Sequence, residues 1–503
     1  MGARLLLTGG TLIDGTGAPA RLADVLIEDG WIRGIGSLPC PADTPRLDCA
    51  GLAVAPGFID AHSHSDLQAL ENRTEKLAQG VTAEVTGNCG FSAFPAPPDR
   101  KPLHEFADGI LHGAGRDWGW PSARDYLEET RRRARLRVHA LVGHGTLRIA
   151  HAGPVQGPLP EHVLRAMERT LEACLDEGAA GFSTGLMYAP GSSAPFEELE
   201  RLCRIVARKG KIYATHMRSY FGAIPEAIDE QLELARRTGC RLQISHLQIA
   251  GRRNWHLQER VIHQIERAAA GGIDVAFDCY PYTAGSTVLT QLLPQWALDG
   301  GAPALLRRLA DPEDRARIAE AAEAGLAWSW EDIFISAVGS PRNADAVGQS
   351  LAQLAVSRAA RPIDAALDLL LEENASVNML CFNQSEENLR ATLAHPLAAI
   401  ISDGFYVSGR PHPRLFGAFP RFLGAYVREH GLMTLEEGVR KMTGLPAERF
   451  GIADSGVIAP GRRADLTVFD PARTGSAASY EQPDLPPQGI RHVFIAGRAV
   501  FPA

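Results

Sequence analysis

Two histidines stand one residue apart directly after an apolar segment, in APGFIDAHSHSD (residues 55–66). Successive side chains of a β-strand point to opposite faces, so His62 and His64 would point the same way at the end of a strand. Two imidazoles directed at one point are typical of a metal site, although such a pair also arises by chance on an exposed edge strand. The pair therefore needs further ligands elsewhere in the chain before it indicates a metal.

The elements that would position these histidines alternate between strand and helix. The middle of the chain carries eight strand-like runs separated by helical ones, which favours parallel βα units and an α/β fold of the (β/α)8 barrel type. A segment at residues 377–384 (VNMLCFNQ) could equally form the seventh strand. The eight runs are residues 58–61, 81–86, 138–142, 180–183, 212–215, 242–245, 275–278 and 399–402.

Both ends of the chain contain short strands with glycine-rich turns. RLLLTGGTLIDGTG and ADVLIEDGWIRGIG stand near the start, and GVIAPGRRADLTVFD and IRHVFIAGRAVF near the end. We predict one small β-sandwich built from residues 1–55 and 451–503, with the barrel of residues 56–415 inserted between them. Residues 289–373 would form a mainly helical insertion, with a lid over the barrel mouth as one option, and residues 416–450 a helical connection.

Barrel enzymes carry their chemistry at the carboxyl ends of the strands, which gives a rule for finding further ligands. Chance could explain any one metal-binding residue at such an end, but not six together. Imidazole nitrogen and thiolate sulfur suit zinc, which lowers the pKa of bound water to about 7 and so favours hydrolysis. A carboxylate beside it, Asp403, would be the general base and acid, and an amide would be the substrate. The six residues are His62 and His64 on the first strand, Cys89 on the second, His216 on the fifth, His246 on the sixth and Asp403 on the eighth.

Composition excludes several other classes of function. The 503 residues carry a formal net charge of -8, which offers no basic surface for nucleic acid or anionic lipid. No apolar run approaches the roughly 20 residues of a membrane-spanning helix, and the N-terminus lacks a signal-peptide pattern. Eight cysteines without a C-x-x-C pair form no disulfide framework. We therefore predict a cytoplasmic enzyme with a small-molecule substrate and neither nucleic-acid nor membrane partners.

The chain also resembles a known family along essentially its whole length. The terminal sandwich, PGFIDAHSHSD and the late SDG are similar to the amidohydrolase superfamily. A series of segments in order resembles its N-acyl-D-amino-acid deacylase (D-aminoacylase) branch. The resemblance implies a zinc-dependent hydrolase of C–N bonds other than peptide bonds, acting on an N-acyl-D-amino acid or a related linear N-acyl compound. The branch segments are GVTAEVTGNCGFS, GHGTLR, GAAGFSTGLMYAPG, YATHMR, LQISHLQIAGRRNW, FDCYPYTAGST, HPRLFGAFPRFLGAYVRE and VRKMTGLPAERFGI.

The resemblance also implies how the ligands divide between two metal positions. In that family the tightly held zinc takes the cysteine after strand two and the histidines after strands five and six, here Cys89, His216 and His246. The H-x-H pair and the late aspartate form a second position that is weakly or variably filled. A carboxylated lysine on the fourth strand is not expected, because the cysteine replaces it as the bridging group and AAGFSTG contains no lysine.

Substrate contacts are expected from the loops behind the strand ends. The resemblance implies that a tyrosine of CYPYTAGST contacts substrate, and we prefer Tyr282 to Tyr280. A guanidinium of SGRPHPRLFG, Arg410 or Arg414, could hold a substrate carboxylate, and Arg410 is the selected candidate. Arg218 could bind a carboxylate or brace the site through a salt bridge, two alternatives that the sequence leaves equal. The remaining candidates are Ser286 as a pocket residue and His144, either as a supporting residue behind the ligands or as a partner of the transition state.

Two departures from the family pattern bear on the substrate. The family commonly has a lysine two residues after the strand-six histidine, where it helps to hold the substrate's α-carboxylate, and this chain has Gln248. After THMR an acidic pair or Asn-Glu is usual, whereas SY (residues 219–220) follows here. Loss of the lysine removes a point charge, which predicts weak activity on simple N-acyl-D-amino acids and a less anionic substrate. The prediction of a less anionic substrate would be wrong if another residue supplied the missing charge from another direction. The candidates for this are Arg252, Arg253 and Arg410.

Two other functions fit part of the same pattern. A cyclic amidohydrolase of the hydantoinase or dihydropyrimidinase type would use the same metal chemistry, but such relatives generally have the bridging lysine that is missing here. A scaffold protein that has lost catalysis is disfavoured by the complete ligand set. The acyl chain, the stereochemistry, one or two metal ions and the oligomeric state, including a homo-oligomer, stay open.

Overall fold

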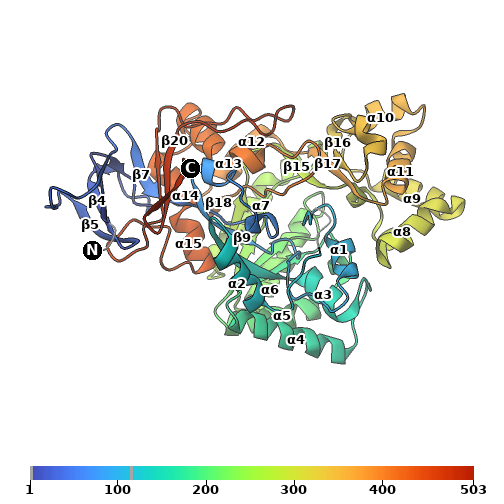
Figure 1. The fold of residues 1–503 in the computed structure, drawn as a ribbon. Coiled ribbons are helices and arrows are strands. Elements are labelled where there is room, and N and C mark those ends of the chain that lie inside the picture. The colour runs from blue at the N-terminus through green and yellow to red at the C-terminus, as the bar shows by residue number, and fades with distance from the viewer. Residues whose placement is uncertain (1–3, 114–116, 503) are drawn as a thin grey trace.

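The computed structural model describes residues 4–113 and 117–502. Residues 1–3 and 503 of the two predicted terminal segments lie outside the described residues. An eight-stranded parallel sheet forms the centre of the molecule (Figure 1), and all eight predicted barrel strands are present in it. The predicted (β/α)8 fold is confirmed. In sheet order the strands are β8 (Phe58–Asp60), β9 (Val81–Thr86), β10 (Arg137–Gly143), β11 (Gly181–Gly185), β12 (Ile212–His216), β13 (Arg241–Ile244), β14 (Val275–Cys279) and β18 (Ala398–Ile400).

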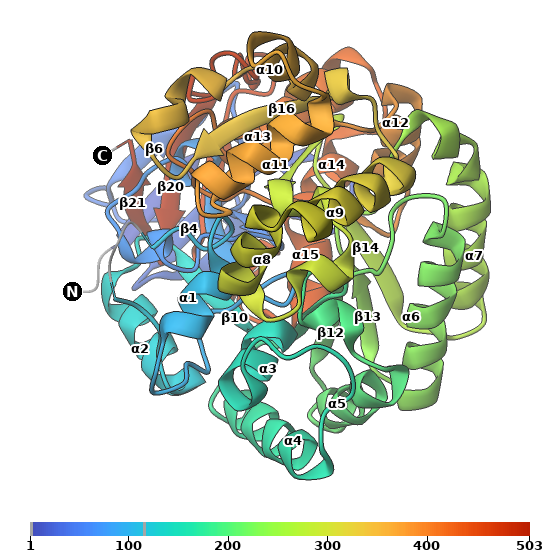
Figure 2. The ribbon, with the colours of Figure 1, turned by 90° about the vertical axis from the view of Figure 1, so that its right-hand side faces the viewer.

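Helices surround the barrel and cover the outer face of its strands. Every residue of β9 is buried, as a parallel sheet covered on both sides requires. Helix α5 buries Leu199, Leu202 and Val206, a spacing of three and four residues that places them on one face. Figure 2 shows α4 to α7 forming part of the outer ring. The helices are α1 (Lys101–Ala107), α2 (Ala123–Arg133), α3 (His144–Ala152), α4 (Glu161–Asp176), α5 (Phe196–Arg208), α6 (Ile224–Thr238), α7 (Gln258–Ala270) and α12 (Glu386–Ala394).

Buried polar side chains close the seam between the first and last barrel strands. The Asp403 amide donates to the carbonyl oxygen of His62 at 2.9 Å, which joins the segments that follow β8 and β18. The buried Lys76 ammonium donates to the Asp60 carboxylate and, at 2.6 Å, to the hydroxyl of Ser402. Asp60 in turn accepts from the backbone amide of Ser402 at 2.9 Å. This network holds the H-x-H pair and Asp403 side by side.

Replacement of Lys76 by methionine should therefore destabilise the barrel. The change leaves the Asp60 carboxylate buried without its cation, which typically costs about 3–5 kcal/mol of unfolding free energy. Urea unfolding of Lys76→Met measures the loss. The control is Lys101→Met, because Lys101 is exposed on α1 and such a change usually stays within about 0.5 kcal/mol. If Lys76→Met is as stable as the wild type, the network does not contribute to closure of the barrel.

Strands from both chain ends build two further sheets, which confirms the predicted sandwich (Figure 1). Their facing side chains form a separate apolar core that includes Leu7, Val25, Leu466 and Phe494. One sheet has the order β5-β4-β1-β6 and the other β21-β20-β19-β7-β2-β3. The strands are β1 (Arg4–Thr8), β2 (Thr11–Leu12), β3 (Arg21–Leu22), β4 (Asp24–Glu28), β5 (Trp31–Gly36), β6 (Arg46–Asp48), β7 (Ala53–Pro56), β19 (Leu466–Phe469), β20 (Ile490–Ile495) and β21 (Arg498–Phe501).

The insertion between β14 and β18 contains a small sheet in addition to the expected helices. Strands β15 (Ala284–Val288) and β16 (Ile333–Val338) pair antiparallel with β17 (Val377–Phe382) between them. The segment that could have been the seventh barrel strand is therefore β17 of this sheet, and β14 takes the barrel position. In Figure 2 the insertion lies in front of the barrel. Its helices are α8 (Gly301–Ala310), α9 (Pro312–Gly325), α10 (Leu351–Ser357) and α11 (Pro362–Glu372).

A helical segment returns the chain from the barrel to the terminal sandwich. It consists of α13 (Arg414–Arg421), a π-helix (Phe422–Glu429), α14 (Leu435–Met442) and α15 (Gly444–Phe450). Among the described helices, none combines the length and the apolar character needed to cross a bilayer.

Candidate metal centre and substrate pocket

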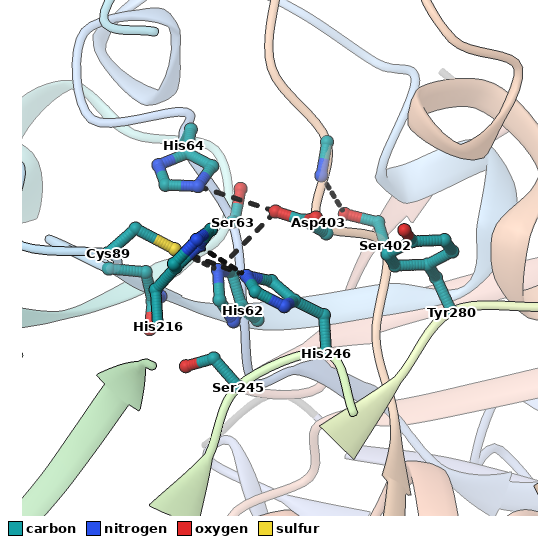
Figure 3. Close-up of polar contacts among 12 residues, drawn as sticks. His62, Ser63, His64, Cys89, His216, Ser245, His246, Tyr280, Ser402 and Asp403 are labelled. Carbon is teal, nitrogen blue, oxygen red and sulfur yellow. Dashed lines mark hydrogen bonds and ion pairs between the residues drawn. The ribbon is translucent and has the colours of Figure 1, made fainter. Parts of the chain in front are cut away.

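The structure brings the six predicted ligand residues together at the carboxyl ends of the barrel strands (Figure 3). Two triads have ligand atoms within 4.8 Å of one another, and Cys89 belongs to both. Its Sγ atom lies 3.3 Å from Nε2 of His62 and 3.5 Å from Nε2 of His246. Cys89 therefore has the position of a bridging ligand. The triads are Cys89 with His216 and His246, and Cys89 with His62 and His64.

Asp403 lies between the histidine pair and a buried arginine. Its Oδ1 atom is 3.4 Å from Nε2 of both His62 and His64. Its Oδ2 atom is 2.9 Å from Nη1 of Arg414, a residue that is 1% exposed. The carboxylate is thus held at the edge of the ligand cluster, with one oxygen facing the histidines.

Sharp backbone turns aim three of these side chains into the cluster. Cys89, His246 and Asp403 have φ values of 52°, 35° and 49°, in the left-handed region that few non-glycine residues occupy. Such conformations cost about 1–3 kcal/mol each and persist where the surrounding structure enforces them. Gly185 makes the turn at Cys89 possible, because a Cβ there would lie 1.9 Å from the carbonyl oxygen of Cys89.

Burial keeps the histidines of the first triad neutral. It lowers the pKa of His246 to about 4 and that of His216 well below its usual value. Neutral imidazoles keep the lone pairs that coordinate a metal. Burial also lowers the pKa of His64 and raises that of the Cys89 thiol, which His62 opposes.

Charge pairing sets the state of the remaining two ligands. Burial alone would lower the pKa of His62, but Cys89 and Asp403 beside it raise that pKa well above its usual value. Burial alone would raise the pKa of Asp403, but Arg414 and His62 hold it well below its usual range. Asp403 is therefore ionised and able to accept a proton or a cation.

The donor set fits zinc. A thiolate, neutral imidazoles and a carboxylate are the ligand types that zinc takes in proteins. Nδ1 of His216 lies 3.0 Å from Nε2 of His246, which in turn lies 3.5 Å from Sγ of Cys89. Ligand atoms that converge in this way form the donor set of a zinc site, so the arrangement favours a bound cation.

Asp278 supports two of the ligands, a role that the sequence analysis missed. Its Oδ1 atom accepts from the backbone amide of His246 at 2.6 Å and lies 3.5 Å from Nδ1 of His62. Its Oδ2 atom accepts from Nε2 of Gln243 at 3.0 Å. Carboxylates that contact ligand histidines in this way fix their orientation. The available signal was an acidic residue inside the otherwise apolar strand VAFDC.

A pocket of about 680 Å³ opens over the ligands, between the barrel and the insertion. Gln248 and Ser286 line it, as expected. The tyrosine in its wall is Tyr280, whose hydroxyl donates to Oε1 of Gln248 at 3.0 Å. Tyr282, the preferred candidate, is buried outside the described lining, and its hydroxyl donates to the carbonyl oxygen of Pro413 at 3.3 Å.

The arginine in the pocket wall is Arg414, while Arg410 is exposed away from it. Among the described lining residues, Arg414 is the one lysine or arginine. Its guanidinium stacks 4.5 Å from the ring centroid of Tyr280. Although it pairs with Asp403, its nitrogens make no well-directed hydrogen bond within the described residues, so donors remain for a ligand.

His144 and Arg218 lie behind the pocket rather than in its described lining. Nε2 of the fully buried His144 is 2.8 Å from Oε1 of Glu198. The Arg218 guanidinium pairs with Glu230 at 2.8 Å and donates to the carbonyl oxygens of Ser192 and Ala194 at 2.7 and 2.6 Å. These contacts favour the bracing alternative for Arg218, because they engage its donors.

Comparison with known proteins agrees with this geometry. Residues 47–501 match the amidohydrolase family. The chain belongs to this family. An N-acyl-D-glutamate deacylase of Alcaligenes xylosoxydans xylosoxydans is 38% identical over 99% of this chain and 93% of its own length. The predicted family membership is thereby confirmed for this amidohydrolase.

Solved structures of similar proteins have the same fold. The crystal structure of the N-acyl-D-glutamate deacylase from Bordetella bronchiseptica, complexed with zinc and a phosphonate that mimics the tetrahedral intermediate, aligns with a TM-score of 0.85. It is 36% identical and covers 99% of this chain and 96% of the other. A D-aminoacylase described as having a binuclear metal centre aligns with a TM-score of 0.83 at 35% identity, over 99% and 96% of the two chains.

Proposed function

We propose that this amidohydrolase cleaves the amide bond of N-acyl-D-amino acids with the help of zinc. The observation that carries the proposal is the pair of triads sharing Cys89, at the base of a pocket whose wall holds one buried guanidinium. The deacylase activity of the similar proteins supports the choice of an N-acyl-D-amino acid over other amides.

The residues divide into metal ligands and a proton carrier. Cys89, His216 and His246 would hold the tight zinc, which when bound polarises an amide carbonyl and acidifies water. Asp403 would accept the proton lost by that water and return it to the leaving nitrogen. Its pairing with Arg414 keeps it ionised before the reaction, the state that a base requires.

A second, weaker metal position would share Cys89 with the first. His62 and His64 face it together with Oδ1 of Asp403. The binuclear centre described for a D-aminoacylase supports this division. Because Asp403 would then serve both as ligand and as base, occupation of the second position should compete with its proton transfer.

The substrate carboxylate would bind at Arg414. A guanidinium offers paired donors that match a carboxylate, and this one lies beside Tyr280 in the pocket wall. Gln248 accepts from Tyr280 through Oε1, which leaves its Nε2 group as a neutral donor toward the same region. The charge that Gln248 lacks is thus partly supplied by Arg414.

A substrate panel with zinc present tests the proposal. N-acetyl-D-methionine should be cleaved at least about tenfold faster than its L-enantiomer and its carboxamide, since a charged contact contributes about 1.5–3 kcal/mol. Gln248→Lys should increase the preference for the free acid by roughly ten-fold or more. Release of free amine is the measurement. A stronger preference for the carboxamide would establish the less anionic substrate instead, and turnover of hydantoin or dihydrouracil alone would establish the cyclic amidohydrolase.

A further inference from the structure

A second cavity, which opens to solvent, lies against the pocket of the metal centre. Ile110, Tyr188 and Gln291 line both spaces, so no more than one layer of side chains separates them. Most of the rest of its lining comes from the segment around α1 and from the insertion between β15 and α8, while Phe91, Ala189, Asn374 and Ala375 come from the loops after β9, β11 and α11. Figure 2 shows α1 and α8 as neighbours in front of the barrel. The second cavity therefore adjoins the pocket of the metal centre across these three side chains.

The large side chains of the second cavity are mainly apolar, and Thr290, Gln291 and Asn374 add uncharged polar groups. Phe91, Phe106, Val288, Leu298 and Leu305 contribute most of the large side chains. No lysine, arginine or histidine occurs among the described lining residues, whereas two carboxylates, Glu105 and Asp108, do. Apolar walls stabilise a hydrocarbon chain, and the carboxylates disfavour a chain that ends in an anion.

The position of Tyr188 indicates which part of a substrate would reach this cavity. Its ring centroid lies 4.9 Å from that of the predicted ligand His216, with the rings tilted, and 5.0 Å from that of Phe91, which lines the second cavity and meets it edge-on. Arg414 contacts Asp403, which faces His62 and His64. The guanidinium and Tyr188 therefore contact different members of the ligand cluster.

The positions of Arg414, the ligand cluster and Tyr188 determine in which direction the acyl group of a bound substrate would point. In an N-acyl amino acid the carboxylate and the side chain branch from the carbon attached to the amide nitrogen, and the acyl chain leaves the carbonyl carbon in the opposite direction. If the carboxylate pairs with Arg414 and the carbonyl lies over the ligands, the acyl chain points toward Tyr188. The Tyr188 hydroxyl lies 3.1 Å from that of Thr287, which fixes the ring at the side of this path.

We propose that the second cavity binds the tail of a medium- or long-chain N-acyl group, so that the preferred substrate is an N-acyl-D-amino acid with an aliphatic acyl chain of about six carbons or more ending in a neutral group. The proposal rests on the proposed function. It adds a subsite that selects the acyl part, formed by the barrel loops and the insertion together.

Chain length and a blocking variant test this subsite. With the D-methionine part constant, kcat/KM should rise about fourfold for each methylene that enters the cavity, so entry of the last three or four methylenes of an octanoyl chain should give on the order of 100-fold over acetyl. Ala302 on α8 lines the second cavity and not the first, so Ala302→Trp should lower the octanoyl-to-acetyl ratio at least about tenfold. The matched control is Ala310→Trp, at an exposed position at the end of the same helix, which should leave the ratio unchanged.

A second substrate series distinguishes the acyl chain from the amino-acid side chain. N-acetyl derivatives of D-alanine, D-norvaline and D-norleucine should respond equally in the wild type and in Ala302→Trp. If Ala302→Trp changes this series and leaves the acyl series unchanged, the cavity holds the side chain and the proposal is overturned. A flat dependence on acyl length in the wild type would overturn it as well.

Binding measurements separate this proposal from the proposed function. Octanoate should bind the zinc-loaded protein at least about tenfold more tightly than acetate, and Ala302→Trp should abolish the difference. Calorimetric titration detects this even if no N-acyl-D-amino acid is cleaved, an outcome that would refute the function alone. Equal affinity for octanoate and acetate would refute the subsite while leaving deacylation of short N-acyl substrates intact.

Discussion

Cys89→Ala should lose the tight zinc and, with it, almost all activity. The thiol is the one ligand that belongs to both triads, so its removal takes a donor from each metal position. Thiolate is also the softest donor in the cluster, and no other sulfur belongs to either described triad. Changes in residues that merely support ligands cost about 10–100-fold in affinity or activity, and loss of a shared ligand should exceed this.

Metal content and turnover of purified protein measure the effect together. The matched control is Cys174→Ala, because Cys174 is a buried cysteine on α4 far along the chain from the ligands. Cys174→Ala should keep wild-type zinc and turnover, apart from a small loss of stability. Stoichiometric zinc and full turnover in Cys89→Ala would refute the assignment of Cys89 as a ligand.

Asp403→Asn should retain the tight zinc while kcat falls by about 10²–10⁴-fold, the usual contribution of general acid–base catalysis. The amide has the shape of the carboxylate but cannot carry a proton. Asparagine also tolerates the left-handed backbone that Asp403 adopts, so the turn should survive the change. The cost should therefore appear in catalysis and not in folding.

The second metal position requires a control, because Asp403 faces its two histidines. Wild type and variant are each assayed with one and with two equivalents of zinc. If the wild type is fully active with one equivalent, a collapse of kcat in Asp403→Asn reflects the missing base. Near-normal kcat in the variant at both zinc levels would show that Asp403 does not transfer the proton.

The convergence of the six candidate ligand residues could be predicted from the sequence because their positions follow a local rule. A short apolar run in the sequence indicates each strand. The residue after that run lies at the carboxyl end of the strand, which is the end where a parallel barrel carries its active site. His216 and His246 directly follow such runs, and Cys89 lies three residues beyond one. All parallel strands of a barrel end at the same side. The residues at these ends therefore lie close together for any conformation of the loops between them.

Which segment forms the seventh barrel strand depends on strand pairing, and no local sequence pattern encodes that pairing. The run at residues 377–384 has the composition of a barrel strand, yet it forms β17 between β15 and β16. Antiparallel pairing with β15, from Ala284 with Phe382 to Val288 with Asn378, decides its place. Such a partner lies about ninety residues earlier, beyond the reach of any local pattern.

The side chains in the pocket wall were decided by tertiary structure alone. Tyr280 and Tyr282 stand in one short turn, and only the packing of α13 determines that Tyr282 faces Pro413 while Tyr280 faces the pocket. Arg414 is drawn inward by the Asp403 carboxylate, whereas Arg410 stays exposed. Sequence by itself thus determined the barrel and the residue types at its strand ends, through local periodicity and the common direction of parallel strands. Which loop side chains enter the pocket was decided by long-range packing and charge pairing, since a loop has no repeating geometry that fixes where its side chains point.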